Sequence, residues 1–195
     1  SFKDACRARG VDVRVGRWAT GGNPRAGLVG FSNLYIQKDR LLATLWEKYK
    51  VDSLLGGWDY LEPVLFGHAA GIAIEEWYRL HVAPSGEPAV AQFHEWMTCS
   101  GMLHLKDVLP QVGTIFTTHA TMLGRALSST GFTPEAALRG RTPQEAAREI
   151  GVPAKHSLES IAAREADVFT TVSGVTADEA ELLLGRRPAP ILPNG

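Results

Sequence analysis

Polar and aromatic residues follow four segments of the sequence that have the composition of β-strands. A hydrophobic core does not require side chains of these types at such positions, and several of them could take part in chemistry or binding. The residues are His94, Glu95, Trp96, His119, Arg125, Ser173 and Asn194. The carboxyl ends of parallel strands meet at one edge of a sheet, and open α/β folds bind their ligands at that edge. We therefore expect a ligand site there.

The residue types allow several roles, which their spacing alone does not separate. His94 and Glu95 have the functional groups of an acid and base pair, or one of them caps the helix that follows. His119 could contact a ligand hydroxyl or act as a base, or it could be a hydrogen-bonded structural group. Arg125 has the planar fork that binds phosphate through two hydrogen bonds, although an arginine near a helix start is more often a solvated surface residue. Trp96 suits a core position better than a stacking platform.

Short β-branched runs alternate with longer segments of helical periodicity, and this alternation predicts an α/β fold with a mostly parallel sheet. The predicted strands are 11–15, 27–31, 89–93, 113–118, 167–172 and 189–192. The predicted helices are 38–50, 61–81, a segment from the third strand to about residue 108, 157–165 and a segment from 176 to 185. We expect helices on both faces of the sheet, with His94, His119 and Asn194 near its carboxyl edge.

Local signals add detail to the helices. The segments 142–145 (Thr-Pro-Gln-Glu) and 176–179 (Thr-Ala-Asp-Glu) have the pattern of a capping box, whose first and fourth residues satisfy each other's backbone N–H groups. Gly67 and Gly71 stand four residues apart in the helix predicted for 61–81, and this spacing predicts close packing on a neighbouring helix. The same spacing also occurs in membrane dimers, but the charged residues of this helix argue against that reading.

The composition is that of one globular domain. The chain has 195 residues, of which 45% are hydrophobic and 21% charged, enough to bury a sizeable core. Twenty Lys and Arg against 21 Asp and Glu give a net charge of −1, which argues against bulk attraction to nucleic acid or an anionic membrane. We find no apolar run of membrane-spanning length and no apolar signal core at the N-terminus. Two cysteines, Cys6 and Cys99, cannot build a disulfide framework, so we expect a cytoplasmic protein.

Several common catalytic templates are absent. The sequence has no GxGxxG and no GxxxxGK[ST], so the usual dinucleotide and P-loop sites lack support. The segment 94–98 (His-Glu-Trp-Met-Thr) lacks the second histidine of a zincin helix, and no serine stands in a GxSxG turn. The six histidines show no metal-ligand spacing.

Six segments resemble motifs of the animal and fungal type of glycogen synthase, glycosyltransferase family 3. They are Gly-Arg-Trp (16–18), Gln-Phe-His-Glu-Trp (92–96), Phe-Thr-Thr-His-Ala-Thr-Met-Leu-Gly-Arg (116–125), Ala-Asp-Val-Phe-Thr-Thr-Val-Ser (166–173), Thr-Ala-Asp-Glu-Ala-Glu (176–181) and Ile-Leu-Pro-Asn-Gly (191–195). The motifs stand in the family's order and extend over nearly the whole chain, whereas 126–156 resembles the family only weakly.

The resemblance implies a retaining glycosyltransferase of the two-domain GT-B architecture, whose N-terminal half is a Rossmann-like, three-layer α/β domain. Such an enzyme moves glucose from a nucleotide sugar to the 4-hydroxyl at the non-reducing end of an α-1,4-glucan. It needs no metal ion, and we expect no cofactor. The sequence does not separate UDP-glucose from ADP-glucose as the donor.

The resemblance also implies roles for residues of the motifs. In the family, the histidine of His-Ala-Thr lies against the donor glucose, the arginine six residues later approaches the nucleotide phosphates, and the asparagine of Pro-Asn-Gly faces the donor. The acidic residue of Phe-His-Glu-Trp lies near the sugar and the acceptor, with its neighbours beside it. The catalytic residues implied in this way are His119 and Glu95, and the substrate-binding residues are Arg125, Asn194, His94 and Trp96.

We expect residues 1–195 to form a single N-terminal, acceptor-side domain. The family's first glycine-rich βα unit and its C-terminal domain have no counterpart in this sequence, so we expect the chain alone to transfer no glucose. A homo-oligomer stays an open alternative. One rival interpretation is a non-catalytic glucan-binding module on the same fold. Another is an unrelated α/β hydrolase that uses His94 and Glu95, which the missing nucleophile motif disfavours.

Overall fold

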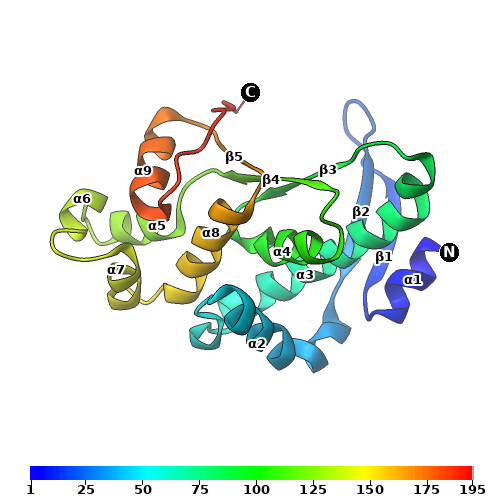
Figure 1. The fold of residues 1–195 in the computed structure, drawn as a ribbon, viewed down its shortest axis with the longest axis horizontal. Helices are drawn as coiled ribbons and strands as arrows, with labels where there is room; N and C mark the ends of the chain where they lie inside the picture. Colours follow the sequence, from blue (N-terminus) through cyan, green and yellow to red (C-terminus); the bar gives the residue numbers. More distant parts are fainter. Residues whose placement is uncertain (195) are drawn as a thin grey trace.

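A three-stranded parallel sheet lies at the centre of the fold (Figure 1). The computed structural model describes residues 1–194. The sheet has the order β3 (Val90–His94), β4 (Gly113–Thr118) and β5 (Val168–Thr171), with all neighbours parallel. The predicted α/β class and the parallel pairing of these three strands are confirmed.

One face of this sheet forms the main core. Phe93, Phe116 and Phe169 occupy neighbouring positions on the three strands and are almost completely buried. They share one face because alternate side chains of a strand point to the same side. Helices that contribute to the same core include α4 (Cys99–Val108), α8 (Pro153–Glu165) and α9 (Gly174–Leu184).

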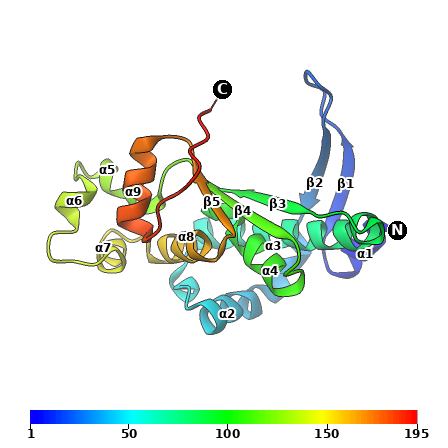
Figure 2. The ribbon, with the colours of Figure 1, turned by 45° about the horizontal axis from the view of Figure 1, so that its top comes forward.

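The opposite face differs from the expectation of helices on both sides. Val90 and Val168 lie on this face and are 65% and 38% exposed in the part of the chain that the structure describes. The strands follow one another across the sheet in a single direction, and right-handed crossovers in one direction place their helices on the same side. Figure 2 shows α4 and α8 together below the strands. In residues 1–194, α4 and α8 therefore cover the same face of the sheet.

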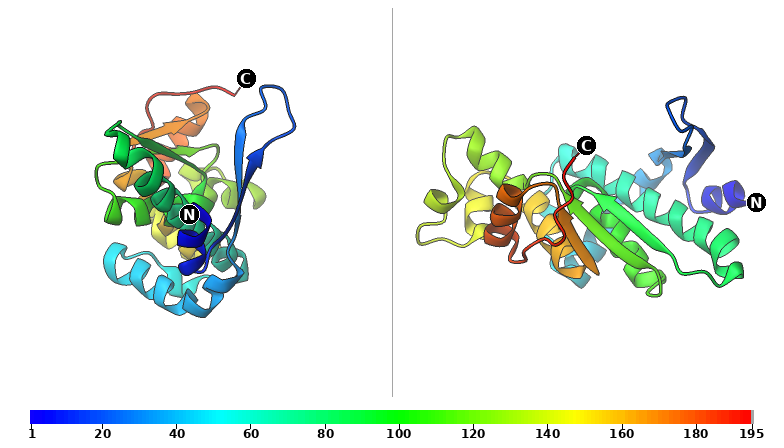
Figure 3. Two further views of the ribbon diagram at one scale, coloured as in Figure 1. Left: turned by 90° about the vertical axis from the view of Figure 1, so that its right-hand side faces the viewer. Right: turned by 90° about the horizontal axis from the view of Figure 1, so that it is seen from above.

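The first two predicted strands form, but they do not join the parallel sheet. β1 (Asp12–Arg17) and β2 (Arg25–Gly30) pair with each other in antiparallel orientation. The connection 18–24 is long enough for a hairpin, whereas a parallel pair needs a crossover of about a dozen residues or more. The hairpin stands beside the helical layer, away from the main sheet (Figures 2 and 3).

The longest helix, α3 (Trp58–Trp77), continues into a π-helical turn at Tyr78–Val82 and packs against α4. A Cβ atom on Gly101 of α4 would lie 2.2 Å from the carbonyl oxygen of Gly67 and 3.1 Å from the amide nitrogen of Gly71. The two backbones therefore touch where side chains would keep them apart. The predicted close packing of this helix is confirmed.

Two further helices surround a second core cluster, on the other side of α3 from α4. They are α1 (Phe2–Ala8), which the sequence analysis did not predict, and α2 (Lys38–Tyr49), which it did. The cluster joins residues of α1, α3 and the hairpin, among them Cys6, Val13 and Leu65. Among residues 1–194, no helix combines the length and the apolarity that a membrane crossing needs.

Three short helices fill the turn-rich region after β4. They are α5 (Met122–Ser129), α6 (Pro134–Ala137) and α7 (Pro143–Glu149). The capping box predicted at 142–145 is confirmed, because Thr142 and Glu145 each bond the backbone N–H of the other.

The second predicted capping box, at 176–179, is wrong. The helix α9 begins earlier, and its N-cap is Ser173, whose hydroxyl accepts a hydrogen bond from the Thr176 N–H. Thr176 therefore lies inside the first turn, and the Glu179 carboxylate is free to contact another element. The helix predicted for 157–165 also starts earlier, because Pro153 occupies its first turn.

The segment predicted as a strand at 189–192 runs alongside β5. The Leu192 N–H donates to the Thr171 carbonyl over 2.7 Å, and a single parallel bridge joins Thr171 to Ile191. This segment pairs with β5 through a single bridge and then continues at the carboxyl edge of that strand.

Candidate functional site

Glu95 occupies a strained backbone conformation directly after β3. Its φ of 63° and ψ of 160° fall in a region that residues other than glycine almost never adopt, at a cost of about 1–3 kcal/mol. Hydrogen bonds hold it there. The Glu95 N–H donates to the Thr117 carbonyl at 2.9 Å, and the Thr98 hydroxyl donates to the carbonyls of His94 and Glu95. Such strain clusters at functional sites.

The Glu95 carboxylate reaches across to the next strand. Its Oε1 atom accepts a hydrogen bond from the backbone N–H of His119, with 2.9 Å between nitrogen and oxygen. His119 is the first residue after β4, so this bond fixes the two strand ends relative to each other. The side chain of Glu95 is 17% exposed and is therefore held at the surface of the edge rather than inside the core.

Two imidazoles meet at the same edge. The Nδ1 atom of His94 lies 3.1 Å from the Nε2 atom of His119, and the ring planes are tilted by 37°. A hydrogen bond at this distance requires that one nitrogen carry a hydrogen and the other not. The two histidines that the sequence placed at neighbouring strand ends are thus in contact, and both remain accessible from solvent.

Arg125 approaches the same carboxylate from α5. Its Nη2 atom lies 3.9 Å from Oε1 of Glu95, and its side chain is 59% exposed. An exposed pair at this distance is weak, so the guanidinium can leave it for a more strongly charged partner. Glu95, His119 and Arg125 therefore form one group around a single oxygen atom.

The buried carboxyl group of Glu159 holds the turn between β4 and α5. Oε2 of Glu159 accepts the Met122 N–H at 2.8 Å, and Oε1 lies 3.3 Å from the Thr118 hydroxyl. Complete burial raises the pKa of Glu159 to about 8, and the negative charges of Glu95 and Glu179 act in the same direction.

Glu179 of α9 supports the same turn from the other side. Its Oε1 atom accepts hydrogen bonds from both the N–H and the hydroxyl of Thr121, the N-cap of α5. Gly124 leaves room for it, since a Cβ atom there would lie 2.4 Å from the carboxylate. These carboxylates set the direction of α5 and thereby the position of Arg125.

Sequence reasoning missed Glu159 and misread Glu179 as part of a capping box. The sequence did contain a signal for Glu159. It is an ionisable residue that stands between Leu158 and Ile161, in a helix rich in small apolar residues. A buried carboxyl in such a stripe needs hydrogen-bond donors, here the backbone and hydroxyl groups of the turn.

The other predicted residues lie in different surroundings. Trp96 is 7% exposed and stacks on Tyr60 at 5.9 Å between ring centroids, in the main core. Ser173 caps α9. Asn194 is exposed and lies two residues beyond Leu192, which bonds the end of β5. The chain direction brings Asn194 to the same edge as His119, while Trp96 faces the core.

The sequence model of the family described as "Glycogen synthase" matches residues 2–195. The chain belongs to the glycogen synthase family. It is 35% identical over 191 residues to glycogen [starch] synthase isoform 2 of Saccharomyces cerevisiae, covering 96% of this chain and 26% of that protein. The identity to the Dictyostelium discoideum glycogen [starch] synthase is 32% over 186 residues, covering 95% and 20%.

Glycogen synthases of animals match to a similar extent. The human liver enzyme, named glycogen [starch] synthase, is 32% identical over 194 residues, or 98% of this chain and 27% of that protein. The chain thus spans about a quarter of the length of these relatives. Membership of the glycogen synthase family, which the motifs indicated, is confirmed.

Proposed function

We propose that this chain is the acceptor-side domain of a retaining glucosyltransferase. The complete enzyme transfers glucose from UDP-glucose or ADP-glucose to the 4-hydroxyl at the non-reducing end of an α-1,4-glucan. The family supports the reaction class, and the contacts at the carboxyl edge of the sheet support the location of the site. The enzyme acts in the cytoplasm, in keeping with its free, buried thiols Cys6 and Cys99.

The observation that carries this proposal is the grouping of Glu95, His119 and Arg125. Both polar contacts of the Glu95 carboxylate use Oε1, so Oε2 has no partner among residues 1–194. A sugar hydroxyl can donate to this free oxygen. The imidazoles of His94 and His119 can accept or donate further hydrogen bonds to the ring. A hexose held by several polar groups of fixed position has its reacting carbon oriented for transfer.

The charges match the reaction. Retaining transfer develops positive charge on the sugar and negative charge on the departing phosphate. The guanidinium of Arg125 can stabilise the phosphate charge, and the carboxylate of Glu95 can stabilise the positive charge of the sugar. His119 positions the donor sugar between them, and Asn194 contacts the donor from the segment that follows Leu192. Trp96 acts only through the core, by supporting the turn that follows Glu95.

The domain organisation is part of the proposal. Residues 1–195 form one domain, which a first glycine-rich βα unit and a second, C-terminal domain complete. Two observations support this. The chain spans only 20–27% of its relatives, and the outer face of the sheet carries the exposed Val90 and Val168. A cleft between two domains encloses the donor and excludes water, which a single domain cannot do.

A transfer assay tests the proposed function. The complete protein is incubated with labelled UDP-glucose or ADP-glucose and glycogen, and the product is digested with β-amylase, which cuts α-1,4 bonds from non-reducing ends. We expect β-amylase to release the label. The 195-residue chain alone should incorporate none. If the complete protein binds glycogen without incorporating label from either donor, it is a non-catalytic glucan-binding module and the proposal is wrong.

A further inference from the structure

A separate pocket of about 340 Å³ lies on the side of α3 that faces α2. Four segments line it: the end of α1, the 3₁₀ turn at Ser32–Gln37, α2 and α3. The α3 residues involved, among them His68, lie on a different stripe of the helix from Gly67 and Gly71, which touch α4. The pocket is therefore separated from the sheet edge by the thickness of α3.

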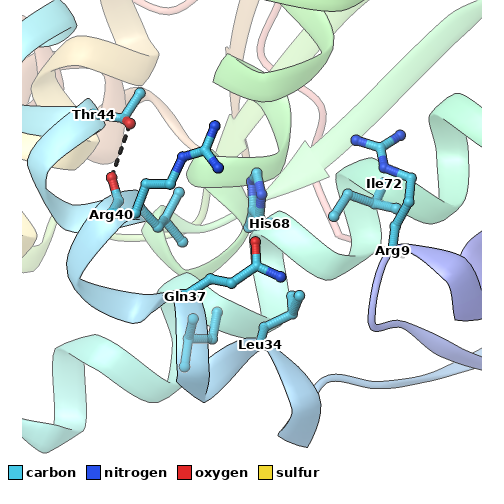
Figure 4. A pocket seen from close by; sticks show the side chains of 9 residues that line it. Arg9, Leu34, Gln37, Arg40, Thr44, His68 and Ile72 are labelled. Atoms are coloured by element: carbon cyan, nitrogen blue, oxygen red, sulfur yellow. Dashed lines mark hydrogen bonds between the residues drawn. The ribbon is translucent and has the colours of Figure 1, made fainter.

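Polar groups from three segments converge on this pocket. Figure 4 shows the Gln37 amide and the Arg40 guanidinium directed toward the His68 ring, while the stem of Arg9 borders the opposite side. Thr44 also lines the pocket, but its hydroxyl donates to the Arg40 carbonyl at 2.8 Å and is already satisfied. The remaining lining residues are apolar: Leu34, Leu41, Leu65 and Ile72.

The two arginines differ in how their charge is balanced. Nη1 of Arg9 lies 2.6 Å from Glu75 Oε2 and 3.0 Å from Glu76 Oε1, so carboxylates of α3 neutralise it. Arg40 has no carboxylate within ion-pair distance in the part of the chain that the structure describes. The pocket therefore carries one uncompensated positive charge, at its α2 side.

His68 adds polarity without adding charge. Burial lowers the pKa of His68 to about 4, and the neighbouring His104 and Arg9 act in the same direction. The ring is neutral near pH 7 and offers one donor and one acceptor. Its Nδ1 atom is buried and has no hydrogen-bond partner among residues 1–194. A ligand in the pocket can therefore reach only the other ring nitrogen, Nε2.

We propose that this pocket binds a small organic anion with one carboxylate or phosphate group. The guanidinium of Arg40 pairs with the anionic group through two hydrogen bonds, and the Gln37 amide donates a third. His68 contacts a hydroxyl of the ligand, and the leucines and Ile72 cover its short carbon skeleton. A volume of about 340 Å³ is at the lower end for small-molecule sites and suits a compact metabolite rather than a polymer.

An NMR titration of the chain tests this site directly. The side-chain resonances of Arg40 (Nε–H) and Gln37 (NH₂) are followed in ¹H–¹⁵N spectra while inorganic phosphate or propionate is added at constant ionic strength. We expect saturable shifts with at least one of the two anions. Arg40→Gln should weaken that binding by about ten- to a hundredfold, the range for loss of a charged hydrogen-bonding group.

A matched control variant distinguishes specific binding in this pocket from a general effect of positive charge. Arg14→Gln removes an exposed arginine of the hairpin and should leave the affinity unchanged. Saturation by phosphate alone identifies a phosphate ligand, and saturation by propionate alone identifies a carboxylate. Shifts that grow linearly with both anions, or an equal affinity in Arg40→Gln and the unmodified chain, would overturn the proposal. Unchanged spectra elsewhere in Arg40→Gln confirm that the variant folds.

Discussion

The Glu95 carboxylate accepts a hydrogen bond from the His119 backbone N–H, although the two residues follow different strands. This bond ties the ends of β3 and β4 together at the edge where the donor sugar is proposed to bind. Because it uses the backbone of His119, it leaves the imidazole free for a ligand. The strained backbone of Glu95 is the conformation from which the carboxylate reaches across.

Glu95→Gln separates the structural role of this side chain from its charge. The amide oxygen can still accept the His119 N–H, so the variant should fold with an unchanged thermal midpoint. In the complete enzyme, kcat should fall by about a hundredfold, because the carboxylate charge that we propose to stabilise the transition state is gone. Steady-state kinetics with glycogen and the preferred donor measure this. Glu135→Gln, at an exposed site on α6, is the control and should keep full activity. A Glu95→Gln enzyme with normal kcat would refute an electrostatic role.

Arg125 should act mainly in the transition state. Its guanidinium is exposed and only weakly paired to Glu95, so it is available for charge that grows as the phosphate departs. In the complete enzyme, Arg125→Ala should lower kcat by about a hundredfold, which corresponds to about 3 kcal/mol. KM should rise by a smaller factor. Arg125→Lys should recover part of the rate, since the ammonium keeps the charge but loses the planar fork. If Arg125→Ala changed only KM, the phosphate role would be limited to ground-state binding.

Glu159 makes the stability of the chain depend on pH. Its folded-state pKa of about 8 lies above the ordinary value of 4.5, so the folded state holds the proton over a range in which the unfolded state has released it. The unfolding free energy should therefore fall as pH rises from about 5 to about 8, by a few kcal/mol. Glu159→Gln mimics the protonated acid and should not show this loss.

Urea denaturation of both proteins at several pH values measures the difference. Glu159→Gln should have the higher unfolding free energy, and its difference from the unmodified chain should grow as pH rises. Above about pH 8 this difference should stay constant. Parallel stability curves over pH 5–8 would show that Glu159 has an ordinary pKa in the folded chain.

The contact between α3 and α4 should not tolerate a side chain. A Cβ atom on Gly101 would lie 2.2 Å from the Gly67 carbonyl oxygen, so Gly101→Ala should lower the unfolding free energy by about 1–3 kcal/mol, although alanine favours the helix. Gly174→Ala, in the first turn of α9 with no atom near its Cβ position, is the matched control and should be neutral or slightly stabilising. Chemical denaturation compares them. Equal stability of the two variants would mean that the helices can separate without cost.

The sequence predicted those parts of the fold that depend on local pattern. The end of β4 was predicted correctly and that of β3 to within one residue, because β-branched runs and flanking polar residues mark a strand, and parallel pairing then brings His94 beside His119. The close approach of α3 to its neighbour followed from Gly67 and Gly71. These features require only that neighbouring residues share a helix or a strand.

The features that the sequence did not predict depend on how distant elements meet. Glu159 and Glu179 come from α8 and α9, and their contact with the turn after β4 follows from the packing of those helices. The antiparallel pairing of β1 with β2 is an exception, because it is local and the short connection 18–24 could have predicted it. Trp96 is buried in the core, as its residue type indicated, and not at the sheet edge where the resemblance implied a binding role.

His119 offers the most direct test of the central claim, that this edge of the sheet holds the sugar donor. In the complete enzyme, His119→Ala keeps the backbone N–H that bonds Glu95 and removes only the imidazole, so the fold should be unchanged by circular dichroism. The rate of labelled glucose incorporation into glycogen should fall by about a hundredfold with either nucleotide sugar. A His119→Ala enzyme that incorporates glucose at the normal rate would contradict the account.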